Sequence, residues 1–285
     1  MTIVISSEVE KSLYLYNIYN IRMKLFRHIA LASILTASFF CSCSKEQSPV
    51  QGEEMRISYN VSIPETKAPV TADGAAINKV WYALYNTDGT LATKYAPVDF
   101  VGGNARCEVV MMRDRSYKIV FVAQHYSNEA TPAYPIDAQN ALIAIPQSPE
   151  ANTDKYDLFY GTQDVTASGS AVGSIVLDRI VSMVNFTCSD EYWNNTQPTC
   201  SSVLLSGVAA GWNLLTGKPS TEKTGITFGK AEIPAAKHLA AAFCFVNGNI
   251  SATLNLYGAA DAPIKTLTVQ DVVVETNKKT NIEIK

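Results

Sequence analysis

Short runs of alternating apolar and polar residues recur along the chain and limit its fold more than any other feature. In ISATLNLY, residues 250–257, Ile, Ala and Leu alternate with Ser, Thr and Asn. Because successive side chains of a strand point to opposite faces, this pattern predicts a strand with one buried face. Turns rich in Gly, Asn and Pro separate such runs, and helical periodicity is scarce. The sequence therefore predicts an all-β fold of antiparallel sheets.

The same alternation predicts strands along much of the chain. They are Lys79–Tyr85, Arg106–Met112, Tyr117–Gln124, Ile175–Phe186, His238–Val246, Ile250–Tyr257, Ile264–Val269 and Thr280–Ile284. An Asn-Thr-Asp-Gly turn follows the first of these strands and leads into TLATKY, residues 90–95, which predicts a hairpin. Between Tyr126 and Pro149 the pattern lapses into a Pro-containing loop with at most one short helix, at Asp137–Ala144.

The N-terminal region has the organisation of an export signal. Residues 23–42 join a cationic start, MKLFRH, to the uncharged run IALASILTASFF, which is too short to span a bilayer and is typical of a signal peptide. Residues 1–22 fit no part of such a signal, and an upstream extension from a start codon chosen too early, with Met23 as the true start, explains them best.

A cysteine at the end of this signal has the surroundings of a bacterial lipidation site. Cys43 follows Ser42 and, three residues upstream, Phe40, whereas Cys41 follows two phenylalanines. We therefore predict that Cys43 carries the lipid, as palmitate or a similar acyl chain, and anchors the protein to the outer membrane through a tether at residues 43–54. The alternative is cleavage by an ordinary signal peptidase, with both cysteines incidental.

A polar stretch divides the remaining chain into two strand-rich halves. It is TCSDEYWNNTQPTC, residues 187–200. We predict two β-sandwich domains, residues 55–187 and 188–285, each large enough to bury a core. No internal repeat is evident in the sequence.

Charge and cysteine content limit the partners and the covalent cross-links. The whole chain has a formal net charge of −3, and no basic run follows the signal, so we expect no nucleic-acid partner. The exported part contains Cys107, Cys188, Cys200 and Cys244. An oxidising compartment permits two disulfides in any of three pairings, but the apolar neighbours of Cys188 and Cys244 fit buried free thiols equally well.

No catalytic constellation is recognisable. His125 and His238 lie outside metal-ligand spacing, and GWNLLTGKP, residues 211–219, has Pro where a phosphate loop needs Ser or Thr. Asp154 and Asp157 fit loop acids better than a glycosidase pair. We expect Arg179, within an apolar strand, to pair with a carboxylate at a sheet edge. The sequence thus predicts no enzyme, no catalytic residue, no cofactor and no metal site.

Aromatic side chains offer an alternative function. Trp81 alternates within a predicted strand and is expected in the core, whereas Trp193 lies in the polar boundary stretch beside Tyr192. Exposed rings can stack on sugars, so Trp193 and Tyr192 are weak candidates for glycan binding by a monomeric surface lipoprotein.

A set of short motifs in a fixed order resembles the fimbrillin-like lipoproteins, the type V pilin relatives of Bacteroides-type bacteria. After the signal come Thr66-Lys67-Ala68, KVWYALYNTDG, YDLFYGTQDV, LDRIVSMVNF, WNLLTGKP and NKKTNIEI. The resemblance covers essentially the whole mature chain. It implies two transthyretin-like β-sandwich domains in tandem and a surface-exposed lipoprotein of the outer membrane or of a fimbria.

The resemblance also implies a mode of assembly and a role in adhesion. A trypsin-like protease cuts such pilins after a basic residue and removes the first strand, and a strand of a neighbouring fimbrial subunit then fills the groove. Here Met55–Ile63 is the removable strand, Lys67 the expected cleavage site and Arg56 a less favoured one. The chain ends directly after NKKTNIEI, which favours a tip, anchoring or non-polymerising component over a shaft subunit; host or bacterial surface ligands are further expected partners.

Overall fold

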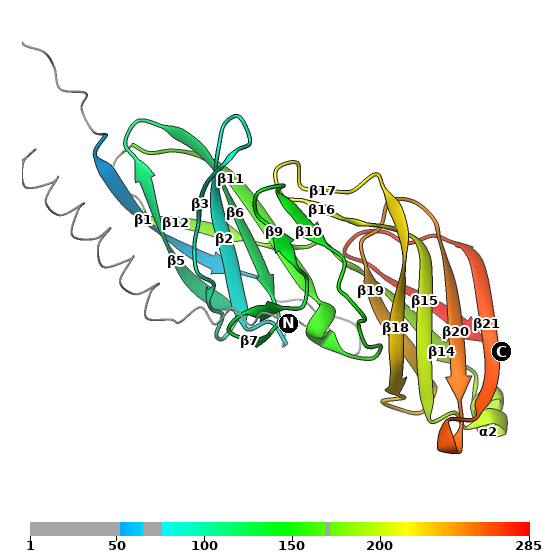
Figure 1. Cartoon of the computed structure of the whole chain (residues 1–285). Helices are drawn as coiled ribbons and strands as arrows, with labels where there is room; N and C mark the ends of the chain where they lie inside the picture. The colour runs from blue at the N-terminus through cyan, green and yellow to red at the C-terminus, as the bar shows by residue number, and fades with distance from the viewer. Residues whose placement is uncertain (1–51, 65–75, 169–171) are drawn as a thin grey trace, which may run out of the picture. The chain divides into compact units, whose positions relative to one another are not determined.

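The computed structural model describes residues 52–64, 76–168 and 172–285 (Figure 1). These residues fall in one compact unit, Gln51–Lys285. Strands paired mainly in antiparallel fashion dominate this part of the chain, which confirms the predicted all-β fold. Cys43 and Lys67 lie outside the described residues.

The first set of strands forms two sheets. Its members are β1 (Glu54–Ser62), β2 (Lys79–Asn86), β3 (Leu91–Lys94), β4 (Val98–Asp99), β5 (Asn104–Met112), β6 (Ser116–Gln124), β11 (Leu158–Thr166), β12 (Val172–Val176) and β13 (Asp178–Arg179). One sheet has the order β12-β1-β5, and the other has the order β13-β11-β6-β2-β3, with β4 also paired to β2. Side chains from both sheets make one core cluster, so the two sheets pack face to face.

The second set repeats this scheme. Its members are β14 (Ser182–Cys188), β15 (Cys200–Ala209), β18 (Lys223–Glu232), β19 (His238–Cys244), β20 (Ile250–Tyr257), β21 (Pro263–Val272) and β22 (Lys279–Ile284). Its sheets have the orders β19-β14-β22 and β18-β15-β20-β21. In both sets the first strand runs antiparallel to one neighbour and parallel to a strand from the end of the set, as β1 does with β5 and β12, and β14 with β19 and β22.

This shared strand order is a structural repeat that the sequence does not reveal. Many different sequences satisfy one pattern of strand pairing, because the pattern needs only alternating apolar positions and suitable turns. Division of the chain into two domains, residues 55–187 and 188–285, stays a prediction.

Short strands and 3-10 helices lie in the segments between the longer strands. The strands are β7 (Tyr126–Asn128), β8 (Thr131–Pro132), β9 (Ile136–Asp137), β10 (Leu142–Ala144), β16 (Gly211–Asn213) and β17 (Lys218–Pro219), and the short 3-10 helices are η1 (Asp154–Tyr156) and η2 (Ala259–Asp261). A small sheet of order β17-β16-β10-β9 pairs β10 with β16. The short helix expected at Asp137–Ala144 is therefore wrong: β9 and β10 form a hairpin, and Ala141 has a φ of 50° in its turn.

The apolar side chains gather in three buried clusters. The first and third lie within the first and second sets of strands. The second cluster draws on both and includes Tyr134, Trp212 and Phe245, with Trp212 6.1 Å from Phe245 between ring centroids. Trp81 belongs to this cluster and is 5% exposed, which confirms its predicted core position.

The segment Ile175–Phe186, predicted as one strand, is three. The chain ends β12 at Val176, makes the two-residue β13 in another sheet, and begins β14 at Ser182. Leu177, Ile180 and Val181 are buried between these strands. An unbroken apolar run marks burial on both sides, and it does not show where the backbone changes sheet.

Candidate functional site

The strand β1 occupies the middle of its three-stranded sheet (Figure 1). All nine of its residues pair antiparallel with β5, and Ser58–Ser62 pair parallel with β12. The two flanking strands therefore run in opposite directions. Any extended segment in this position meets one parallel and one antiparallel neighbour, whichever way it runs. Strand β12 has no other strand neighbour within the described residues.

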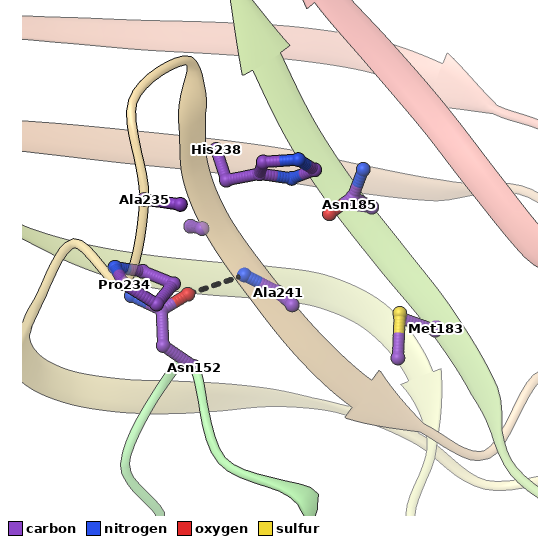
Figure 2. A pocket seen from close by; sticks show the side chains of 8 residues that line it. Asn152, Met183, Asn185, Pro234, Ala235, His238 and Ala241 are labelled. Atoms are coloured by element: carbon purple, nitrogen blue, oxygen red, sulfur yellow. Dashed lines mark hydrogen bonds between the residues drawn. The ribbon is translucent and has the colours of Figure 1, made fainter. Parts of the chain in front are cut away.

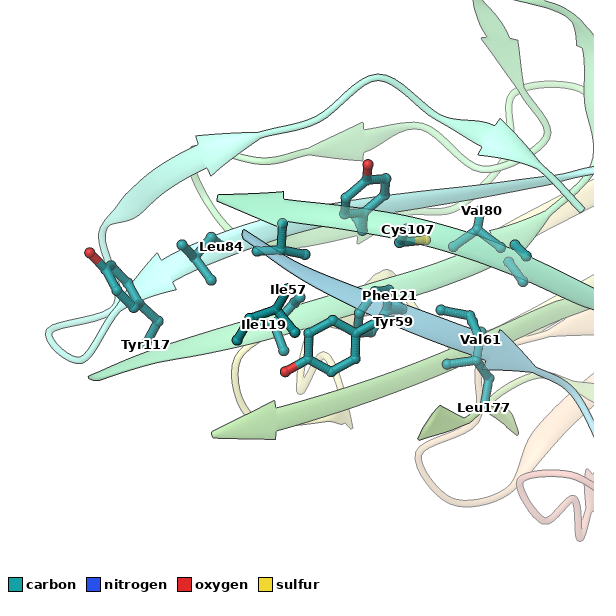
Figure 3. Close-up of a cluster of buried hydrophobic side chains, with 14 of the residues drawn as sticks. Ile57, Tyr59, Val61, Val80, Leu84, Cys107, Tyr117, Ile119, Phe121 and Leu177 are labelled. Atoms are coloured by element: carbon teal, nitrogen blue, oxygen red, sulfur yellow. The ribbon is translucent and has the colours of Figure 1, made fainter. Parts of the chain in front are cut away.

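The inward face of β1 is apolar and fully covered. Met55, Ile57, Tyr59 and Val61 are 7%, 3%, 2% and 0% exposed. Figure 3 shows Ile57, Tyr59 and Val61 among side chains of the first cluster, including those of Phe121 and Leu177. The predicted alternation of Met55–Ile63 is confirmed, and each of these side chains fills a separate place in the core.

The outward face of β1 is polar and makes contacts typical of a surface. Ser58 Oγ accepts a hydrogen bond from Arg106 Nε at 2.7 Å, and Arg106 also pairs with Glu108 at 3.1 Å. Hydrogen bonds from Ser58 and Arg106 lower the pKa of Glu108 below its usual value. The side chain of Arg56 is exposed, but its backbone lies inside the ladder with β5, opposite Val110. A protease needs an accessible extended backbone, so this geometry disfavours cleavage at Arg56.

All four cysteines of the described chain are free thiols. Cys107 is fully buried and lies opposite Tyr59 in the register of β1 and β5. Burial raises the pKa of Cys107 and of Cys244 to about 12. Of the two states left open by the sequence, the structure holds free thiols, buried at Cys107, Cys188 and Cys244 and partly exposed at Cys200, rather than disulfides.

Tyr192 and Trp193 lie on the one α-helix of the described residues, α2 (Asp190–Thr196). Ser189 caps its start by accepting a hydrogen bond from the Tyr192 N–H. Both aromatic rings are half-buried and pack against the third cluster. The Tyr192 ring is further covered by the Lys265 ammonium, 5.6 Å from its centroid. Trp193 is therefore only partly exposed, less than the sequence led us to expect.

Arg179 makes the structural ion pair that the sequence predicts. Its Nε and Nη2 atoms donate to the two carboxylate oxygens of Asp157, at 2.8 and 2.9 Å. Asp157 is fully buried, and the Arg179 guanidinium also lies 5.1 Å from the centre of the Phe159 ring. Because β13 is the edge strand of its sheet, the pair holds a sheet edge as expected.

A separate cavity of about 190 Å³ lies beside β14 and β19 (Figure 2). Asn152, Met183, Asn185 and His238 are among its lining residues. Two of the polar side chains there are already hydrogen-bonded: Asn152 Oδ1 accepts the Ala241 N–H at 2.8 Å, and Asn185 Nδ2 donates to Asn281 at 2.9 Å. Asn152 thus caps the edge strand β19, a contact that no sequence pattern indicated.

The described residues contain no cluster of three or more His, Cys, Asp or Glu side chains that could hold a metal ion. His125 instead bonds the carbonyl of Ala76 through Nδ1, at 2.8 Å. Within the same ranges, the helices are all too short or too polar to cross a bilayer. We call the space that β1 fills between β5 and β12 the groove, and we take it as the candidate site.

Comparison with known proteins places the chain in a family. No curated protein sequence matches it. Among solved structures, it is similar to a fimbrial assembly protein from Parabacteroides distasonis, with 12% identity, a TM-score of 0.43, and coverage of 81% of this chain and 90% of that one. It is also similar to the fimbrial anchor protein Mfa2 from Porphyromonas gingivalis, with 13% identity, a TM-score of 0.43, and coverage of 77% and 83%. Residues 47–284 match the model of a family of unknown function, DUF6562, and the chain belongs to that family.

Proposed function

We propose that this chain is a cell-surface lipoprotein of the fimbrillin type, a structural or accessory subunit of fimbriae that is assembled by protease-triggered strand exchange and acts in adhesion. The observation that carries the proposal is the position of β1. It is a central strand with a fully buried apolar face, yet it is the first strand of its set and continues directly into the segment that contains Lys67. Cleavage after Lys67 would leave β1 held by non-covalent contacts alone.

Loss of β1 would open a groove that restricts which segment can fill it. The backbone groups of β5 that face β1 would lose their partners along nine residues, and β12 would lose its strand neighbour. Buried backbone groups without partners cost free energy, so the groove favours entry of another extended segment. A strand from a second subunit restores those hydrogen bonds and refills the apolar positions.

The equivalent strand of the second set is held in place by its chain connections. Strand β14 has the same two kinds of neighbour, but the chain continues from it in both directions, into β13 on one side and α2 on the other. One cut cannot release it. We therefore assign exchange to the first set and a permanent, closed structure to the second.

A lipid on Cys43 would anchor the uncut chain to the outer membrane, with residues 43–54 as the tether. Cleavage after Lys67 would separate this anchor, together with β1, from the rest of the chain. The glycan-binding alternative requires open aromatic faces, and the half-buried rings of Tyr192 and Trp193 do not favour it.

Intact mass spectrometry of the protein from the surface of the native cell tests the proposal. An N-terminus at Ala68 in assembled material is the expected result for a subunit that has exchanged its first strand. A population that is entirely lipidated at Cys43 and never cleaved would contradict strand exchange and leave an anchored monomer.

A further inference from the structure

Tyr59, at the centre of β1, has small neighbours on both sides. In the register of the sheet it lies opposite Cys107 of β5 and Gly173 of β12. The next inward position, Val61, lies between Ala105 and Ile175 instead. The Phe121 ring of the opposite sheet lies beneath Tyr59, with 5.3 Å between centroids and a tilt of 51°. Cys107, Gly173 and the Phe121 ring together outline a slot that the Tyr59 ring fills.

Gly173 is what leaves room for the ring. A Cβ atom built on Gly173 would lie 2.5 Å from Cδ1 and 2.8 Å from Cζ of Tyr59, and closer still to Cε1. Real side chains do not approach so closely, so any residue other than glycine would push the ring out of the slot. Glycine weakens a strand on its own, and a ring packed over it supplies the missing contact.

The slot fixes the register of whatever strand lies in the groove. A shift by one residue would turn the apolar face outward. A shift by two would place Ile57 or Val61 beside Gly173 and would move the Tyr59 ring beside Val109 or Ile175, each of which is larger than the glycine. Only one register puts the aromatic ring opposite the glycine.

The inward pattern of β1 is the same in both directions. Tyr59 has a branched aliphatic residue two positions away on each side, Ile57 and Val61, and an unbranched or branched apolar residue four positions away, Met55 and Ile63. Because β5 and β12 run in opposite directions, the groove does not itself impose a direction on its occupant. The central slot is therefore the feature that can select and align an incoming strand.

We propose that Gly173, with Cys107, forms an aromatic-selective slot, and that the strand that takes the place of β1 must present Phe, Tyr or Trp there with branched aliphatic residues two positions to either side. This inference rests on the proposed strand exchange and adds to it the chemistry of the partner strand. The occupant is a segment of another subunit, and its sequence pattern, rather than its direction, is what the groove recognises.

Peptide exchange on the chain that begins at Cys43, cut at Lys67, tests the slot. The probe is a synthetic peptide of residues 53–63, EEMRISYNVSI, compared with versions carrying Tyr59→Phe, Tyr59→Ala and, as a matched control, Ile57→Ala, which lies outside the pairing with β12. Binding is measured by native mass spectrometry. The Phe version should bind as the parent does, and the Tyr59→Ala version should bind about a hundredfold more weakly.

The variant Gly173→Ala separates the slot from general apolar burial. Each peptide's affinity for this variant is compared with its own affinity for the unmodified protein. The Tyr and Phe peptides should lose at least about tenfold, whereas the Tyr59→Ala and Ile57→Ala peptides should lose much less. Folding of the uncut Gly173→Ala and Tyr59→Ala/Gly173→Ala chains is checked first by circular dichroism, and the double variant keeps the comparison usable if the single one is unstable.

The outcomes distinguish the slot from the exchange itself. Peptides that enter the groove with no preference for an aromatic at position 59, or with a preference that Gly173→Ala leaves intact, would overturn the slot and keep strand exchange. A cut protein that takes up none of the peptides would overturn both.

Discussion

Removing the Arg179 guanidinium should lower the free energy of unfolding far more than removing a charge at the surface. In Arg179→Met the side chain keeps its length and apolar stem, but Asp157 loses two charge-assisted hydrogen bonds of 2.8 and 2.9 Å. The Asp157 carboxylate is fully buried, so water cannot replace the lost partner. Breaking one side of a buried ion pair typically costs about 3–5 kcal/mol of the free energy of unfolding.

The assay is urea unfolding of the mature chain at pH 7, followed by tryptophan fluorescence. A matched control is Lys230→Met, because Lys230 pairs with Asp261 at 2.8 Å on the surface, where the side chains are 35% and 67% exposed. That change should cost no more than about 1 kcal/mol. Both variants lose one positive charge and one contact of that charge with an aromatic ring, Phe159 for Arg179 and Tyr257 for Lys230, so the main difference is the burial of the carboxylate partner.

The double variant Asp157→Asn/Arg179→Met checks the mechanism. It removes the buried negative charge that loses its ion-pair partner in the single variant, and it should recover part of the lost stability. An Arg179→Met cost below about 1 kcal/mol, or a double variant no more stable than Arg179→Met, would refute the reasoning that the buried carboxylate depends on this partner.

Three further predictions follow from the structure. Burial raises the pKa of four tyrosines from 10.0 to about 12: Tyr82, Tyr85, Tyr126 and Tyr160. As the pH rises, these hydroxyls therefore lose their protons in the unfolded chain before they do so in the folded protein. In denaturant unfolding, their contribution to the free energy of unfolding should be complete below pH 10 and should fall between pH 10 and 12. In the native protein Cys200, which is partly exposed, should react with iodoacetamide well before the buried Cys107, Cys188 and Cys244, as peptide mapping would reveal; equal rates would contradict the packing. Asn152→Ala removes the side-chain bonds to Ala241 N–H and to the Glu232 carbonyl and places alanine at a φ of 60°, so urea unfolding should show a loss of about 1–3 kcal/mol, and an unchanged midpoint would refute the capping role.

Local alternation predicted those strands whose own side chains keep a period of two. Ile250–Tyr257 has the predicted bounds, and its buried and half-buried residues alternate throughout. Strand β15 escaped prediction because Ser201, Ser202 and Val203 are buried in succession and because an extra residue interrupts its pairing with β18 between Ser206 and Val208. Buried serines and an extra residue both break the period of two on which the prediction depends.

The remaining errors have similar local causes. Helix α2 spans only seven residues, too few to show helical periodicity, although Ser189 is a usable capping signal. The sequence predicted that Arg179 pairs with a carboxylate. Which carboxylate it meets, Asp157, depends on the pairing of β11 with β13. The slot over Gly173 was beyond reach, because nothing in the sequence shows that Gly173 lies beside Tyr59.

Release of β1 is the central claim, and the reactivity of Cys107 measures it directly. This thiol is fully buried on β5, next to β1 and opposite Tyr59. After cleavage at Lys67, added β1 peptide or a partner strand should displace the original strand, and iodoacetamide should label Cys107 during the exchange while Cys244, buried in the second set, stays unlabelled. If β1 stays bound after cleavage under conditions that keep the protein folded, and Cys107 remains as protected as in the uncut chain, the account of strand exchange is contradicted.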